Sequence, residues 1–206
     1  FGGQQAESDA NAAFFLFAFI VGIFLMSILL MVQLNSFYQV FIIVSAVVLS
    51  TYGVQLGLLV TQQISSALFT SLGVIALAGI VVNNNIVLVD TYNVITKENP
   101  NLSREQIVIR TAAQRLRPII LTTATTVIGL LPLASGIGVD FYQRNIEIGG
   151  RVSEWWQPMS FAVVCGLTFA SAITLFLTPC WLMLPEAIRK TFRQVRKSFL
   201  KTASER

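Results

Sequence analysis

The sequence predicts an all-α integral membrane protein with five transmembrane helices. One observation is composition, because 54% of the 206 residues are hydrophobic and only 12% are charged. That balance fits a membrane protein better than a soluble domain. A second observation is a set of five apolar stretches, each close to the roughly 20 residues that a helix needs to cross a bilayer. These stretches cover residues 12–34, 37–60, 68–89, 118–137 and 156–184.

The third observation is the distribution of Lys and Arg. Twelve of the 14 basic residues lie in two segments, the loop after the third stretch and residues 185–206. Five membrane crossings put both segments on the same side, and basic residues accumulate on the cytoplasmic side. We therefore expect the N-terminus to lie outside the cytoplasm and residues 185–206 to form a basic cytoplasmic tail.

The first two apolar stretches are expected to form a tight helical hairpin, because only Asn35 and Ser36 separate them. The segment before them, residues 1–11, is polar and lacks the basic region of a signal peptide. The chain begins at Phe1, so we expect it to be part of a longer protein. In the second stretch Gly53 and Gly57 are four residues apart, a spacing that allows close approach of another helix.

The third stretch carries three consecutive asparagines, Asn83, Asn84 and Asn85, among Ile, Val and Leu. Successive helical residues rotate by about 100°, so the three side chains cannot share one partner. Asn83 lies on one face with Ala76, Gly79, Val87 and Asp90. This small, polar face is expected to point into the helix bundle. Asn84 and Asn85 are expected to hold helices together through hydrogen bonds.

The inner loop is expected to contain a short helix on the membrane surface at about residues 103–115. Ser103 and Gln106 have the spacing of a capping box, and apolar residues then recur every fourth position. The fourth stretch starts at Pro118, a residue favoured in the first turn of a helix. Arg115 shares a face with Thr122, Thr126 and Gly129. That stripe is compatible with proton transfer through water or with hydroxyls bonded to their own helix.

The outer loop, residues 138–155, is expected to form a small hairpin around Gly149 and Gly150. In the fifth stretch Pro158 is expected near the helix start, whereas Pro132 and Pro179 fall inside the fourth and fifth helices. Trp155, Trp156 and Trp181 are placed as in an aromatic belt at the membrane interfaces.

Several kinds of chemistry have no candidate residues. The chain has no histidine, and no stretch carries a central Asp, Glu or Lys, which a complete proton relay normally needs at depth. No phosphate loop or zinc motif occurs. We therefore expect no enzymatic activity, no cofactor, no metal site and no nucleic-acid partner.

Two segments resemble a known family. The stretches GIVVNNNIVLVDTYN (79–93) and QRLRPIILTTATTVIGLLPLA (114–134) are similar to the tenth and eleventh transmembrane helices of resistance-nodulation-division (RND) efflux pumps. The similarity is to the hydrophobe/amphiphile exporter branch. Residues 34–59 and the segment LTPCWLML near the chain end resemble the same branch, so the resemblance covers nearly the whole chain in order.

The resemblance implies that the chain is helices 8–12, half of a twelve-helix membrane domain. Residues 1–11 would leave a periplasmic porter domain, and the outer loop would be periplasmic. Such pumps are proton-driven antiporters of the bacterial inner membrane. They act as homotrimers with a periplasmic adaptor and an outer-membrane channel. Two aspartates in the N-terminal half of the pump would complete the proton relay.

The resemblance also implies roles for individual residues. Arg115 matches the arginine before the eleventh helix, and Thr122 matches the relay threonine. Asn83 stands where many of these pumps carry a relay lysine, and Asn84 matches the polar position after it. The lysine's charge is therefore missing here, although an amide can still donate and accept hydrogen bonds. Gly53, Gly57, Gly79, Asn85 and Gly129 would be packing positions.

Two other functions are compatible with the residues. One is a self-contained five-helix scaffold or channel in which the asparagines and threonines only join helices. The other is an RND relative that exports lipids or assists protein translocation.

Overall fold

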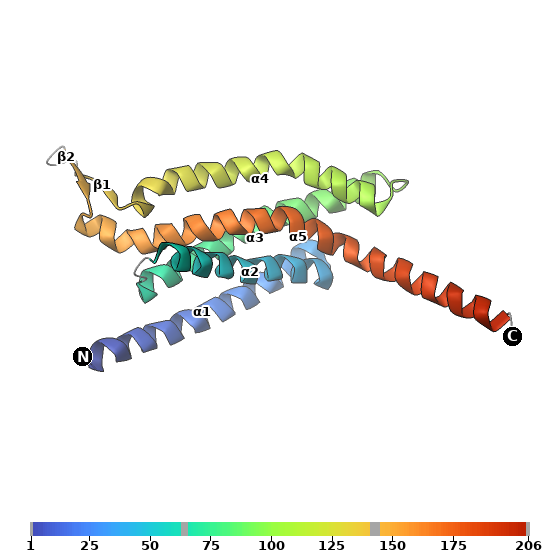
Figure 1. The fold of residues 1–206 in the computed structure, drawn as a ribbon, viewed down its shortest axis with the longest axis horizontal. Helices are drawn as coiled ribbons and strands as arrows, with labels where there is room; N and C mark the ends of the chain where they lie inside the picture. Colours follow the sequence, from blue (N-terminus) through green and yellow to red (C-terminus); the bar gives the residue numbers. More distant parts are fainter. Residues whose placement is uncertain (1, 63–65, 141–144, 205–206) are drawn as a thin grey trace.

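The computed structural model describes the backbone of residues 2–62, 66–140 and 145–204. Within these residues the chain forms five helices and one two-stranded hairpin (Figure 1). The elements are α1 (Gly2–Leu34), α2 (Phe37–Thr61), α3 (Ala67–Glu98), α4 (Arg104–Ala134), β1 (Ile137–Asp140), β2 (Asn145–Ile148) and α5 (Arg151–Ser204).

Each of the five helices contains a segment long and apolar enough to cross a membrane. These segments are Ala10–Leu34, Phe37–Thr61, Leu68–Glu98, Arg104–Ala134 and Trp155–Pro185. The predicted fold class, an all-α membrane protein with five spans, is confirmed. The hairpin is the one addition to it in the described part of the chain.

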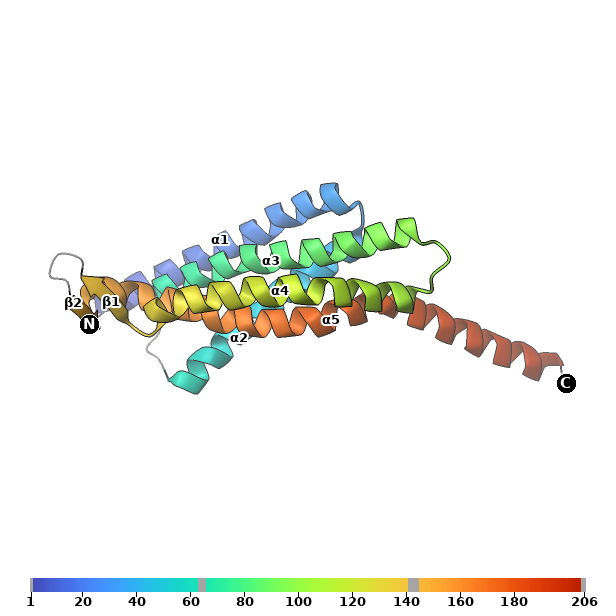
Figure 2. The same cartoon turned by 90° about the horizontal axis from the view of Figure 1, so that it is seen from above.

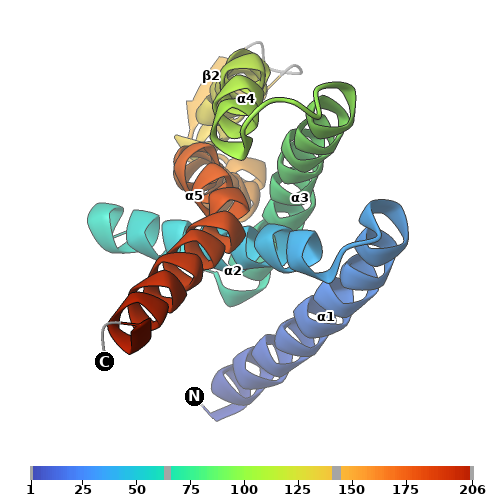
Figure 3. The ribbon, with the colours of Figure 1, turned by 90° about the vertical axis from the view of Figure 1, so that its right-hand side faces the viewer.

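Helix α5 is the centre of the bundle. It packs against α2, α3 and α4, whereas α1 packs against α2 and α3. Seen from the end, α1 and α4 lie on opposite sides of α3 (Figure 3). Figure 2 shows that α3, α4 and α5 run side by side over most of their lengths. Only 6% of the apolar segment of α1 is buried among these helices, so the rest of the described chain leaves most of α1 uncovered.

Glycines set how closely the helices meet. A Cβ atom added to Gly53 would lie 2.5 Å from Cβ of Phe169, and one added to Gly57 would lie 2.5 Å from Cβ of Cys165. Real Cβ atoms do not approach so closely, so α2 and α5 need glycine at both positions. The structure therefore places Gly53 and Gly57 in a helix contact, as their spacing predicts.

Helix α4 corrects one predicted boundary. The surface helix and the fourth span are continuous, with Pro118 and Pro132 both inside α4. Placing Pro118 at a helix start was wrong. A proline deprives the carbonyl four residues earlier of its partner, but membrane helices tolerate this when neighbouring groups or local adjustments satisfy it. The predicted cap at Ser103 is confirmed, since its hydroxyl accepts a hydrogen bond from the backbone N–H of Gln106 at 3.3 Å.

The outer loop and the last helix also differ from expectation. The strands pair Ile137 with Ile148 and Asp140 with Asn145, so the connection between them is residues 141–144. Gly149 therefore follows the hairpin instead of forming its turn, and its positive φ of 83° suits the change of direction before α5. Helix α5 includes Pro158, Pro179 and Pro185 and continues through the predicted tail to Ser204. Pro158 is thus interior, and the side chains of residues 186–206 lie outside those described.

Candidate functional site

The three consecutive asparagines of α3 lie in three different environments. Asn83 is exposed, Asn84 is half-buried and Asn85 is fully buried, with 0% of its surface accessible. This follows from the rotation of about 100° per residue. The three side chains therefore have different neighbours.

Asn85 is tied to α5. Its Nδ2 donates to the carbonyl of Val81 at 2.9 Å and to Oγ1 of Thr174 at 3.3 Å. Its Oδ1 accepts a hydrogen bond from Oγ1 of Thr178 at 2.9 Å. Both threonines are buried, so these bonds satisfy polar groups that water does not reach. Asn85 is placed as a link between helices, in agreement with its predicted packing role.

Asn83, unlike Asn85, lies on an exposed face of α3. Ala76, Gly79, Asn83, Val87 and Asp90, which share one face of α3, are all exposed. A Cβ atom added to Gly79 would meet nothing within 4 Å. The expectation that this face points into the bundle is therefore wrong for these five helices. They bury the face that carries Asn85, where large apolar residues such as Leu77 and Leu88 pack.

Helix α4 presents a matching surface. Thr122 and Gly129 are exposed, and a Cβ atom at Gly129 would also meet nothing within 4 Å. The Thr122 hydroxyl donates to the carbonyl of Ile119 at 3.0 Å, and that of Thr126 donates to the carbonyl of Thr122 at 2.8 Å. The lone pairs of both oxygens can still accept hydrogen bonds from another group. Gly79 and Gly129, predicted as packing positions, thus have no packing partner among the described residues.

Arg115 fixes the register between α3 and α4. Its Nε donates to Oγ1 of Thr91, which in turn donates to the carbonyl of Val87 at 2.7 Å. From this contact Asn83 is eight residues back along α3, and Thr122 is seven residues forward along α4. At about 1.5 Å per residue, both lie roughly 10–12 Å from the Arg115 contact along antiparallel helices. Asn83 and Thr122 are therefore at nearly the same depth.

Sequence reasoning missed several polar contacts. Thr123 of α4 and Ser171 of α5 share a hydrogen bond of 2.7 Å, and Gln39 of α2 and Asn93 of α3 exchange two bonds of 2.6 and 3.0 Å. One signal was available, because Ser171, Thr174 and Thr178 are spaced i, i+3 and i+7 and so share a face of α5. That face bonds to α3 and α4.

The comparisons with known proteins agree with the sequence resemblance. Residues 1–185 match the model of the AcrB/AcrD/AcrF family. Over 126 residues the chain is 32% identical to multidrug resistance protein MdtC of Citrobacter koseri, covering 61% of this chain and 11% of that protein. Over 178 residues it is 29% identical to swarming motility protein SwrC of Bacillus subtilis, covering 86% of this chain and 16% of that protein.

Solved structures show the same relationship. The chain is similar to a heavy metal efflux pump seen in two crystal forms, with TM-scores of 0.63 and 0.64 and sequence identities of 30% and 28%. These matches cover 80% and 88% of this chain, and 15% and 16% of the pump. The chain thus spans about one sixth or less of the relatives that it matches. It belongs to the AcrB/AcrD/AcrF family and is part of the membrane region of an RND efflux transporter.

Proposed function

We propose that this chain is the C-terminal membrane part of a proton-driven RND exporter of hydrophobic compounds, and that it supplies one side of the proton relay. Relatives named as a multidrug resistance protein and as a heavy metal efflux pump support an export role. The relay assignment depends on the surface of α3 and α4 described above.

One observation carries the proposal: a small, polar surface left uncovered in the middle of two apolar helices. Asn83 on α3 and Thr122 on α4 are exposed at nearly the same depth. Lipid offers no hydrogen bonds, so polar side chains at depth normally face protein or a water-filled cavity. The N-terminal half of the same pump, with the relay aspartates that the family resemblance implies, has the chemistry to cover this surface.

Each of these residues has a separate role in the proposed proton relay. Arg115, anchored by Thr91, supplies a fixed positive charge near the cytoplasmic end of the relay. Thr122 accepts or passes a hydrogen bond through water. Asn83 and Asn84 bind a water molecule or a protonated carboxyl group, because an amide both donates and accepts. An amide carries no charge to exchange with the aspartates, so the change in charge on proton binding falls on the carboxylates of the N-terminal half.

The placement in the cell follows the charge distribution. Twelve of 14 basic residues lie on one side of the five spans, which favours a cytoplasmic C-terminus and a periplasmic N-terminus in a bacterial inner membrane. The family resemblance supports a homotrimer that works with a periplasmic adaptor and an outer-membrane channel. It also supports contacts with membrane lipid and no nucleic-acid partner.

The test uses the full-length pump that contains this chain. Thr122→Val keeps the shape of the side chain and removes the hydroxyl, so we expect export to fall at least tenfold with unchanged abundance in the membrane. Thr168→Val is the matched control, because Thr168 is also exposed and donates to its own helix at 2.7 Å, but lies on α5. Export that is equal in the two variants would remove Thr122 from the relay.

A further inference from the structure

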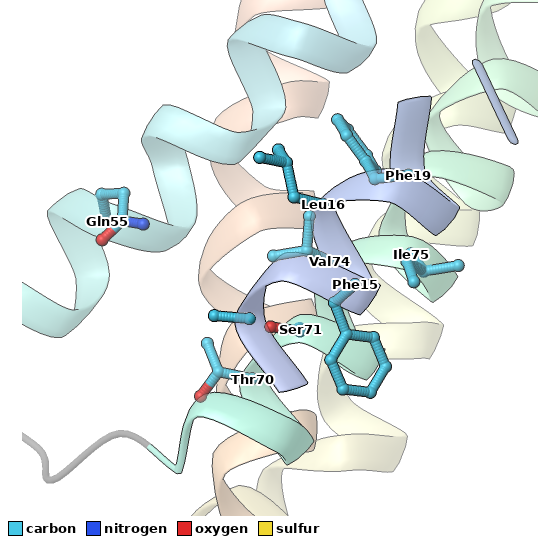
Figure 4. Close-up of a pocket in the computed structure, with 9 residues that line it drawn as sticks. Phe15, Leu16, Phe19, Gln55, Thr70, Ser71, Val74 and Ile75 are labelled. Carbon is cyan, nitrogen blue, oxygen red and sulfur yellow. The ribbon is translucent and has the colours of Figure 1, made fainter. Parts of the chain in front are cut away.

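A second feature lies near one end of the bundle, where α1, α2 and α3 meet. There a cavity of about 270 Å³ is bounded by all three helices. Figure 4 shows Phe15, Leu16 and Phe19 of α1 beside Thr70 and Val74 of α3, with Gln55 standing across from them on α2. The cavity is separate from the Asn83–Thr122 surface.

The Thr70 hydroxyl is unusual among the polar groups of the described helices. Hydroxyls such as those of Ser50 and Thr91 donate to a carbonyl three or four residues earlier. In the described part of the chain the Thr70 oxygen, like that of Ser153, is buried without a hydrogen-bond partner. A buried hydroxyl without a partner destabilises by roughly 1–3 kcal/mol, so a group that completes this bond is favoured.

The depth of the cavity identifies what can reach it. Thr70 is two residues after Leu68, where the third apolar span starts, or about 3 Å from that end along the helix axis. Val74 on α3 and Gln55 on α2 are each six residues from an end of their spans, or about 9 Å. The cavity therefore occupies one leaflet, with its hydroxyl close to the boundary between hydrocarbon and headgroups.

Size and access favour a single alkyl chain. The volume lies just under the roughly 300–1,000 Å³ of sites for drug-sized ligands. The cavity also opens at the surface of the five helices, because two of its lining residues, Leu16 and Ile75, are 62% and 37% exposed. A second apolar groove, between α2 and α5, is larger at about 450 Å³ but is lined only by apolar side chains and Cys180, so it offers no hydrogen-bonding group that selects a ligand.

We propose that the cavity between α1, α2 and α3 binds one phospholipid of the adjacent leaflet, with the upper part of an acyl chain against Phe15 and Phe19 and its ester carbonyl accepting a hydrogen bond from Thr70. The Gln55 amide lies deeper and bounds the chain on the α2 side. The bound lipid fills the space between α1 and the rest of the bundle. This site depends on the membrane-spanning fold and is independent of proton coupling.

The test is photolabelling of the full-length pump in proteoliposomes with phosphatidylglycerol that carries a diazirine in the upper part of one acyl chain. Labelled peptides are then mapped by mass spectrometry. We expect adducts concentrated on the α1 and α3 peptides that line the cavity. Ala12→Phe and Val74→Phe fill the cavity from two different helices and should each reduce these adducts at least fivefold, while adducts at the α2–α5 groove stay unchanged as a control for folding.

A second pair of variants tests the hydrogen bond. Thr70→Val should lower labelling of the cavity about two- to tenfold, the range expected for one hydrogen bond, and Thr70→Ser should retain it. Three results would overturn the proposal. The amount of adduct on the cavity peptides could stay the same in both filling variants, or it could be no higher than at Phe17 on the exposed side of α1. The cavity peptides could also remain unlabelled because another part of the pump occupies the cavity. If neither filling variant reaches the membrane, the comparison with Phe17 in the unmodified pump decides. A failure of Thr122→Val to affect export would leave these outcomes unchanged.

Discussion

Asn85 and Asn83 provide a test in which the same substitution is made two residues apart. Asn85→Ala removes two hydrogen bonds between α3 and α5, the bond to Thr174 at 3.3 Å and the bond from Thr178 at 2.9 Å. Hydrogen bonds between membrane helices average about 0.6 kcal/mol and reach about 1.7 kcal/mol. We therefore expect the bundle to lose about 1–3 kcal/mol of stability, with partial compensation if the threonines turn to their own helix.

The stability can be measured on the purified full-length pump in detergent micelles, as the shift of the unfolding midpoint on addition of dodecyl sulfate. Asn83→Ala is the matched control, because Asn83 is exposed on the surface of these five helices. We expect Asn83→Ala to shift the midpoint by less than half as much and to reduce export instead. Equal midpoints for the two variants, or no shift for Asn85→Ala, would refute the division of the asparagines into a structural and a functional one.

Two further predictions concern the contacts of α2 and α4. Gly53→Ala should destabilise the pump by about 1–3 kcal/mol through overpacking, because the added Cβ would lie 2.5 Å from Cβ of Phe169. Gly22→Ala is the control, since a Cβ there would meet nothing within 4 Å. Equal thermal stability of the two variants would contradict the close approach of α2 and α5. Thr91→Val should leave Arg115 without its hydrogen-bond acceptor and lower export, whereas Thr91→Ser should keep both the acceptor and the export activity. Export is measured as uptake of a fluorescent substrate into inverted vesicles. Full activity of the valine variant would show that Arg115 does not need this hydrogen bond.

The sequence predicted the helices well because apolar length is a local property. Each of the five predicted stretches corresponds to one helix of the structure. The ends of the helices were harder to predict. Pro118 and Pro158 mark helix starts by local preference, yet both lie inside helices, because a membrane helix can continue through proline where surrounding groups satisfy its backbone.

The sequence also predicted which residues share a helix face, but it could not tell which face the bundle covers. Asn83, Gly79 and Asp90 do share one face of α3, but these five helices do not bury that face. Periodicity is uninformative here, because a span surrounded by lipid on one side and helices on the other is apolar all round. The buried side is decided by where Leu77, Leu88 and Asn85 meet α5.

By itself, the sequence determined that this is a five-span α-helical membrane protein, and its motifs in α3 and α4 pointed to RND transporters. These properties depend on composition, on spacing along single helices and on residues close together in the chain. Only the tertiary structure separated the three asparagines, brought Asn83 and Thr122 to one depth and left the Thr70 hydroxyl beside a cavity. Each of these depends on how helices distant in sequence rotate and slide against one another, and that is set by close contacts such as those of Gly53 with Phe169 and of Arg115 with Thr91.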